Sequence, residues 1–131
     1  MVFVMKASRA AATGKLVVVI DDDALVLEAT ESLLRSWGFR VVTGESYSAA
    51  MARLREIGER PDLIICDYRL SEGPTGLDAI AMLRHLFEIP ALLISADGSL
   101  PQSDDGAYRL LHKPVNVEAF RALVDASVVQ R

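Results

Sequence analysis

Short runs of consecutive apolar residues, separated by helix-like segments, constrain the fold of this chain more than any other feature. Runs of four or five apolar residues occupy Leu16–Ile20, Leu63–Cys66 and Ala91–Ile94, and shorter strand-like pieces occupy Val41–Thr43 and Tyr108–Leu111. An uninterrupted apolar run of this length is typical of a strand covered on both faces, as the strands of a parallel sheet are. The pattern therefore predicts a buried parallel sheet.

The segments between these runs have the spacing and the end signals of helices. Val26, Ala29 and Leu33 lie on one stripe of the first segment, which predicts an amphipathic helix. The end signals are Asp23 and Gly38 for this helix, Ser46 and Gly58 for the second, Pro90 after the third, and Asn116 before the last.

Strands and helices alternate along the chain, which predicts an α/β fold. We expect a doubly wound, five-stranded parallel sheet with helices on both faces, as in flavodoxin-like proteins. Asp97–Gly106 is rich in glycine, serine and proline, so the fourth crossover should be a short or irregular helix. Residues 1–14 show neither the strand spacing nor the helix spacing of apolar residues, and we interpret them as a leader or linker. Residues 15–131 are interpreted as one domain.

Composition excludes several classes of protein. The 131 residues are 51% hydrophobic and 24% charged, which is too apolar for a disordered chain. No run of apolar residues exceeds five, so no membrane span is predicted. The net charge of −4 argues against a nucleic-acid-binding surface. The single cysteine, Cys66, cannot form an internal disulfide, which fits a cytoplasmic location.

Polar residues follow the predicted strands at the point where each strand ends. Asp21 and Asp22 follow the first strand, Asp67 the third, Ser95 the fourth and Lys113 the fifth. In an open parallel sheet these ends meet at one edge, where ligands bind. Carboxylates brought together repel one another unless a cation such as Mg²⁺ binds them. A hydroxyl and an ammonium beside the metal suit a transferring phosphoryl group.

On these residues the chain resembles the receiver domains of two-component response regulators, which have the CheY-like fold. The resemblance covers about residues 16–128. By this likeness Asp67 is the phosphoacceptor, and Ser95 and Lys113 complete the site. The implied metal ligands are Asp21, Asp22, Asp67 and the main-chain carbonyl of Arg69; Lys113-Pro114 is a dipeptide that is often cis in the family.

The resemblance implies phosphorelay signalling in a bacterial cytoplasm. Asp67 would take a phosphoryl group from a phosphohistidine, with Mg²⁺, or Mn²⁺ in its place, as the cofactor. The implied partner is a histidine kinase or a histidine phosphotransfer protein, with no nucleic acid and no membrane contact by this domain. The domain would be a regulatory phosphoacceptor rather than an enzyme, and a monomer or weak dimer. Arg69 and Asp97 would tune the lifetime of the phosphorylated state.

The chain departs from the family pattern in the region that usually transmits the signal. Leu110 stands where the family places a switch aromatic, and Ser71 stands where it places a proline. The short segment between Ser95 and Lys113 resembles that of receivers at the C-terminus of hybrid sensor histidine kinases. We therefore expect a phosphoryl relay rather than a dimerising switch. Its partner should dock through the helix around Ala24–Leu27 and the loop after Ser95.

Two other functions are compatible with some of these residues. A haloacid-dehalogenase-like phosphatase would use Asp21 as its nucleophile, but that interpretation leaves Asp67 without a role. A pseudo-receiver would be a protein-binding module that is never phosphorylated, and the complete set of site residues argues against it.

Overall fold

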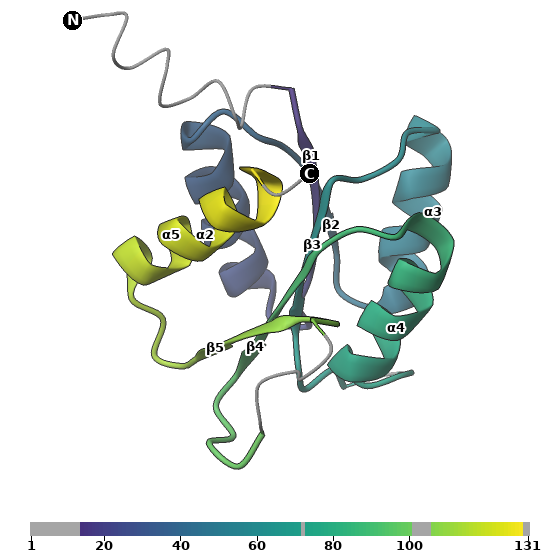
Figure 1. Ribbon diagram of the computed structural model, residues 1–131. Helices are drawn as coiled ribbons and strands as arrows, with labels where there is room; N and C mark the ends of the chain where they lie inside the picture. Colours follow the sequence, from purple (N-terminus) through teal and green to yellow (C-terminus); the bar gives the residue numbers. More distant parts are fainter. Residues whose placement is uncertain (1–13, 72, 101–105, 130–131) are drawn as a thin grey trace, which may run out of the picture.

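The computed structural model describes residues 14–71, 73–100 and 106–129, and shows a single sheet between two layers of helices (Figure 1). The strands are β1 (Leu16–Ile20), β2 (Arg40–Gly44), β3 (Leu63–Asp67), β4 (Ala91–Ser95) and β5 (Arg109–His112). The helices are α2 (Ala24–Ser36), α3 (Tyr47–Ile57), α4 (Gly76–Phe87) and α5 (Val117–Val129).

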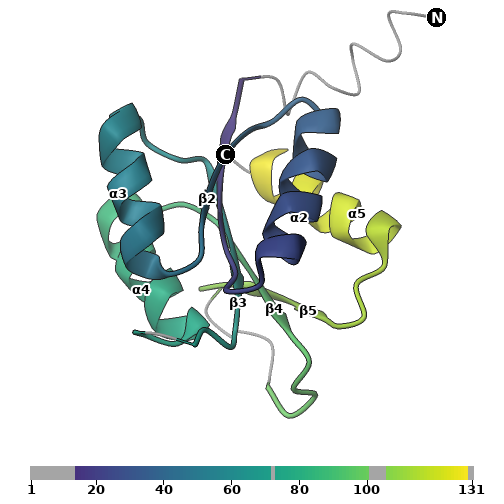
Figure 2. The ribbon, with the colours of Figure 1, turned by 180° about the vertical axis from the view of Figure 1, so that it is seen from behind.

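The five strands form one parallel sheet in the order β2-β1-β3-β4-β5, which confirms the doubly wound topology. Helices α2 and α5 cover one face, and α3 and α4 cover the other, as both views show (Figures 1 and 2). The order along the sheet changes direction beside β1, so the carboxyl ends of β1 and β3 lie together at the switch point.

Alternate residues of the strands build two separate cores. On the α3 and α4 side, Val18, Ile64 and Leu93 pack with helical residues such as Leu54 and Leu83. On the α2 and α5 side the neighbouring residues of the same strands pack with helix residues. Val19, Ile65 and Leu92 lie there against Leu34, Trp37 and Phe120. Because both faces of the sheet are buried, the strands show the continuous apolar runs that predicted them.

The helix ends follow the predicted caps, and α4 has in addition a start signal that was not predicted. The carboxylate of Asp23 accepts from the amides of Leu25 and Val26 at the start of α2. Helix α4 begins with a reciprocal capping box between Thr75 and Asp78. It ends at Phe87, where Glu88 adopts a left-handed conformation, and Pro90 follows three residues later, as predicted.

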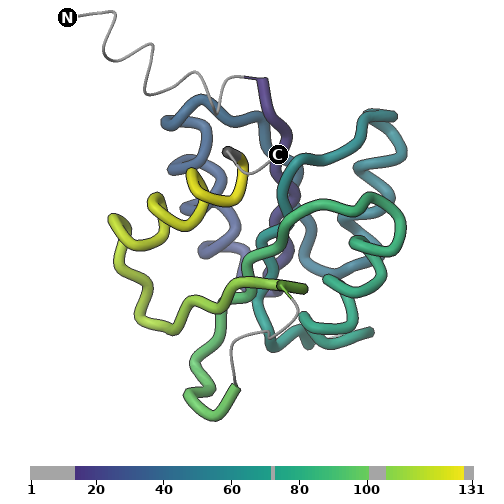
Figure 3. The backbone as a smooth tube through the Cα atoms, in the orientation of Figure 1, coloured from purple at the N-terminus to yellow at the C-terminus, as the bar shows by residue number. Residues whose placement is uncertain are grey.

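The connection from β4 to β5 contains no helix in residues 96–100 or 106–108, the part that the structure describes (Figure 3). This agrees with the irregular fourth crossover expected from its composition. Strand β5 begins one residue later than predicted.

The proposed leader falls almost entirely on residues 1–13, which lie outside the described residues. None of the described helices has the length and apolar character that a membrane crossing requires.

Candidate functional site

The carboxyl ends of four strands place the predicted site residues along one edge of the sheet, the lower edge in Figure 1. Asp21 follows β1 directly, Asp67 is the last residue of β3, and Ser95 is the last residue of β4. Lys113 follows β5, and its amide donates to the carbonyl of Ser95 at 2.9 Å, which ties the loop to the end of β4.

Three carboxylates form the centre of this site. One oxygen from each of Asp21, Asp22 and Asp67 lies within 4.8 Å of the others. Asp21 and Asp67 are buried, whereas Asp22 is exposed. The close approach of three negative groups is the arrangement expected of a site for a cation.

Backbone amides orient each of these carboxylates. The amide of Asp23 donates to Asp21 Oδ1 at 2.9 Å, and the amide of Ser71 donates to Asp22 Oδ2 at 3.0 Å. The amide of Arg69 donates to Asp67 Oδ2 at 3.1 Å. Each amide occupies one oxygen and leaves the other lone pairs of the carboxylate for a cation or a reacting group.

Lys113 forms the ion pair of the site. Its Nζ lies 2.7 Å from Asp67 Oδ1, with 38% of the lysine side chain and 7% of the aspartate side chain exposed. Partial burial lowers the pKa of Lys113, but the hydrogen bond and the attraction of Asp67 outweigh this, so the net shift is upward. Lys113 is therefore a stable positive charge beside the proposed acceptor, with Asp21 and Asp22 also close enough to stabilise it.

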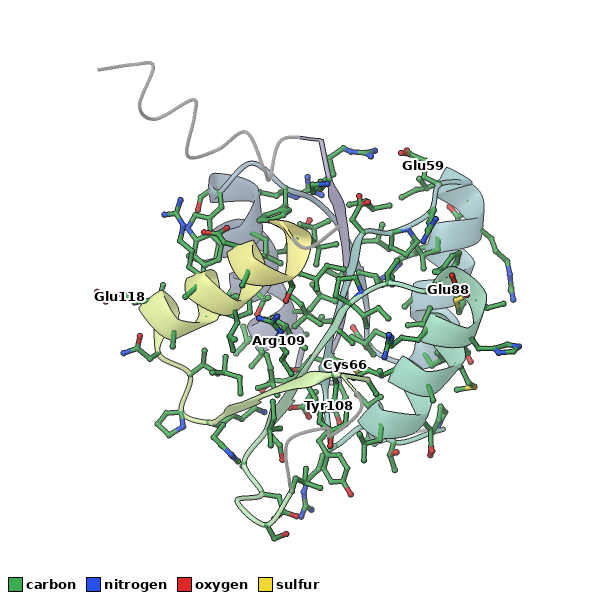
Figure 4. The ribbon with its side chains drawn as sticks, viewed as in Figure 1. Glu59, Cys66, Glu88, Tyr108, Arg109 and Glu118 are labelled. Atoms are coloured by element: carbon green, nitrogen blue, oxygen red, sulfur yellow. The ribbon has the colours of Figure 1, made fainter. Side chains whose placement is uncertain are left out.

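Burial and mutual repulsion act on two further groups. Burial raises the pKa of Asp21; the amide of Asp23 opposes this effect, and repulsion from Asp67 adds to it. Burial also raises the pKa of the Cys66 thiol, which lies within the sheet (Figure 4). Cys66 donates to the carbonyl of Asp67 at 3.3 Å, so it is a neutral packing residue of β3.

Ser95 is held with its hydroxyl proton available. The side chain is buried, and its oxygen accepts from the amide of Asp97 at 2.9 Å. Because that bond uses a lone pair of the oxygen, the O–H can still donate to a group in the site. The carboxylate of Asp97 accepts from the amide and hydroxyl of Ser99, at 2.9 and 2.6 Å, and these bonds lower its pKa.

The donor set fits Mg²⁺. All the groups brought together are carboxylate oxygens, the hard ligands that Mg²⁺ and Mn²⁺ prefer, and described residues supply no histidine or thiolate to this cluster. The amide of Arg69 faces Asp67; the role of its carbonyl as a further ligand stays a prediction.

A mostly apolar pocket of about 190 Å³ adjoins the carboxylates between α2 and α5. Its rim carries Val26, Val115 and Val117, all of them partly or largely exposed. Asp67 and Lys113 line one end, so the pocket opens directly beside the proposed acceptor. Apolar periodicity placed these helices on the sheet, but no motif in the sequence marks the space between them.

The family model of the response regulator receiver domain matches residues 17–125. The chain belongs to this family. The match covers β2 to β5, all of β1 except Leu16, and the site positions Asp21, Asp67, Ser95 and Lys113.

Curated relatives of this receiver domain include response regulators from several bacteria. The response regulator protein TmoT of Ectopseudomonas mendocina is 38% identical over 106 residues, covering 76% of this chain and 46% of that protein. The transcriptional regulatory protein ZraR of Escherichia coli K12 is 29% identical over 120 residues, covering 86% of this chain and 26% of ZraR. The phyllosphere-induced regulator PhyR of Methylorubrum extorquens is 30% identical over 80 residues. The receiver domain thus spans about a quarter to a half of the length of these relatives.

Solved structures agree on the fold. A CheY-like receiver domain from Methanospirillum hungatei superimposes with a TM-score of 0.78 at 20% identity, over 90% of this chain and 96% of that one. A receiver domain from Clostridium thermocellum gives a TM-score of 0.77 at 21% identity, over 88% of this chain and 95% of that one.

The structure brings together Asp21, Asp22, Asp67 and Lys113, and places Ser95 at the end of the adjoining strand. The peptide bond between Lys113 and Pro114 is cis, as the resemblance implied. Sequence reasoning missed Gly76, whose amide donates to the carbonyl of Tyr68 at 2.9 Å and so fixes the loop after the acceptor. The sequence Thr75-x-x-Asp78, a capping-box pattern, could have placed this glycine at the start of α4.

Asp21→Asn should stabilise the receiver domain at pH 7 in metal-free buffer. A folded-state pKa above the unfolded value of about 3.9 means that ionisation of the carboxyl lowers stability as pH rises through these two values. Asparagine stays neutral, and its carbonyl can still accept from the amide of Asp23. Urea unfolding should therefore show a higher midpoint for the variant at pH 7, and the difference should vanish below the unfolded pKa.

Asp23→Asn provides the control, because asparagine caps a helix as well as aspartate does and Asp23 is exposed. Its midpoint should stay close to that of the unmodified chain. An Asp21→Asn variant that unfolds at a lower urea concentration at pH 7 would contradict the account of burial and repulsion at Asp21.

Proposed function

We propose that this receiver domain accepts a phosphoryl group on Asp67 from a phosphohistidine, in a Mg²⁺-dependent phosphorelay. The observation that carries the proposal is the contact of a buried, amide-oriented Asp67 carboxylate with both the acidic cluster and the Lys113 ammonium. Such a carboxylate is held in place, and a cation and an ammonium beside it would favour the approach of an anionic phosphoryl group.

The proposed transfer forms one bond and breaks one. An oxygen of Asp67 attacks phosphorus through a lone pair that neither Lys113 nor the amide of Arg69 uses. The P–N bond to the imidazole breaks, and the leaving imidazole nitrogen takes up a proton from solvent. Asp21, Asp22 and Asp67 would hold Mg²⁺, which when bound neutralises charge on the phosphoryl oxygens. Lys113 and the Ser95 hydroxyl are the donors of this chain for the remaining phosphoryl oxygens.

The apolar rim between α2 and α5 supports docking of a histidine-bearing helix. Leu25 and Val26 on α2 and Val117 on α5 are exposed, and the pocket beside them opens onto Asp67. An apolar surface next to the acceptor is suited to a histidine kinase or a histidine phosphotransfer protein. A cytoplasmic setting and an origin in a hybrid histidine kinase are part of this proposal.

The output of the receiver domain is proposed to be relay. The position expected to carry a switch aromatic is Leu110, which is buried on the α3 and α4 side of the sheet. The described part of the β4–β5 connection has no helix that phosphorylation could reposition. A structural element with two discrete arrangements is needed to transmit a signal. Without an aromatic side chain at Leu110 and without a helix in the described part of the β4–β5 connection, the receiver domain has little of the element that usually serves this purpose.

Labelling with acetyl phosphate and Mg²⁺, mapped by peptide mass spectrometry, tests the proposal. A phosphoryl group on Asp67 that appears only with Mg²⁺ is the expected result. Labelling of Asp21 would instead support the phosphatase interpretation, and labelling of neither residue would support a pseudo-receiver.

Beryllofluoride with Mg²⁺ should leave the receiver domain monomeric and shift few amide resonances. The expected NMR changes are centred on Asp21, Asp67, Ser95 and Lys113, because these residues surround the bound group. Sedimentation velocity of the same sample should match the free protein. A dimer, or large shifts centred on β5 and α5, would contradict the relay proposal while leaving Asp67 as the acceptor.

A further inference from the structure

Strand β2 lies at an edge of the sheet. Some of its backbone N–H and C=O groups face β1, and the others face away from the sheet. The amide of Arg40 donates to the carbonyl of Lys15, and the carbonyl of Gly44 accepts from the amide of Asp21. In a parallel ladder the residues that bond to the neighbouring strand alternate along the chain. The register of β1 with β2 therefore directs the N–H and C=O groups of Val41 and Thr43 away from the sheet.

Arginine side chains bind both outward carbonyls. Arg35 Nη2 donates to the carbonyl oxygen of Val41 at 3.1 Å, and Arg53 Nη1 donates to that of Thr43 at 2.5 Å. Arg35 is held in turn by Glu31, one helical turn earlier, with 2.9 Å between Nε and Oε2.

The two arginines reach the edge from opposite faces of the sheet. Arg35 belongs to α2 and Arg53 to α3, and these helices lie on the two sides of β2 (Figures 1 and 2). Together the two side chains cover the β2 edge from both faces of the sheet. The strand itself contains no proline and no lysine, two residues that commonly protect an exposed edge. Its one charged residue, Arg40, lies at its first position and pairs with Glu59 rather than with the outward carbonyls.

The outward groups would otherwise be complementary to those of another copy of β2. In an antiparallel pair, hydrogen-bonded positions recur at every second residue. A two-fold axis through Val42 would therefore place Val41 of each copy opposite Thr43 of the other. All four carbonyls that such a pair needs are the ones that arginine side chains occupy.

The surface beside β2 is hollowed on the α3 side. A shallow hollow along this edge is lined by Val41, Val42, Thr43, Arg53, Glu56 and Ile57. Ile57 is 44% exposed there, so an added strand would also cover apolar surface.

We propose that Arg35 and Arg53 close the β2 edge to strand pairing with a second copy of this chain. Neither arginine is among the residues of the acidic site, so this inference is independent of the proposed phosphoryl transfer. The arginines act as a barrier to self-association, since an incoming strand must displace two charge-assisted hydrogen bonds from each copy.

The double variant Arg35→Ala and Arg53→Ala tests the proposal. Sedimentation velocity over a concentration series should show self-association at least about tenfold stronger than in the unmodified chain. Slowed hydrogen exchange at the amides of Val41 and Thr43 should accompany it. Circular dichroism verifies the fold, and each single variant, which loses only one cap, should show a smaller increase.

Arg55→Ala with Arg60→Ala is the matched control, because it removes the same charge near the end of α3. Arg55 is exposed, and Arg60 donates to the carbonyl of Phe87 rather than to a strand. The control should remain as monomeric as the unmodified chain. The proposal is overturned if the double variant associates no more than this control, or associates without protecting Val41 and Thr43.

Discussion

Asp67→Asn is expected to abolish phosphoryl labelling by acetyl phosphate. An amide oxygen is a poor nucleophile and cannot give a stable acyl phosphate, so the loss should be complete rather than graded. The amide of Arg69 can still donate to the asparagine carbonyl, and the remainder of β3 is unchanged. Intact-mass spectrometry after incubation with Mg²⁺ and acetyl phosphate measures the labelled fraction.

Asp23→Asn is the matched control for this experiment. It changes the same functional group close to the site, but Asp23 is an exposed helix cap that asparagine can replace. Labelling of this variant should match that of the unmodified chain. Undiminished labelling of Asp67→Asn would show that another residue is the acceptor.

Gly76→Ala is expected to disturb the acceptor loop more than any other small substitution. A Cβ on Gly76 would lie 2.2 Å from the carbonyl oxygen of Asp67 and 2.7 Å from the Cα of Tyr68. Both are backbone atoms, so the loop or the start of α4 must move. We expect a loss of about 3 kcal/mol in the free energy of unfolding, at the upper end of over-packing penalties, and a Tm lower by roughly 10 °C.

Labelling of Gly76→Ala should also slow, because the shift displaces the backbone that orients the Asp67 carboxylate. Gly98→Ala is the control. A Cβ on Gly98 meets no atom within 4 Å, and this glycine also lies in a loop at the same edge of the sheet. Thermal unfolding by differential scanning calorimetry compares the two. Equal Tm values would show that α4 can move away from the loop at little cost.

The strands and the site edge could be predicted because burial on both faces leaves a direct trace in the sequence. The run Leu16–Ile20 coincides with β1, and the polar residue after it, Asp21, falls at the end of the strand. The predicted bounds of strand β5 were off by one residue, since Arg109 at its start is only half-buried and His112 at its end is exposed. A partly exposed edge strand lacks the continuous apolar run that marks a central one.

Contacts between distant residues could not be predicted in this way. Arg35 and Arg53 look like ordinary charged positions on exposed helix faces, and only the register of β1 with β2 shows which carbonyls they meet. The same holds for Glu59, which lies near the end of α3 and pairs with Arg40 at 2.7 Å (Figure 4). Side-chain bonds to backbone depend on packing that local periodicity does not contain.

The ammonium of Lys113, paired with Asp67, sets the net charge of the whole site. Counted by formal charge, three carboxylates and one ammonium give minus two within a few ångströms. One divalent cation would bring that cluster to neutrality, whereas a monovalent cation would leave it negative. Without the ammonium, the three carboxylates would need three positive charges to reach neutrality. A single lysine beside the proposed acceptor thus leaves a formal charge that one divalent cation would balance.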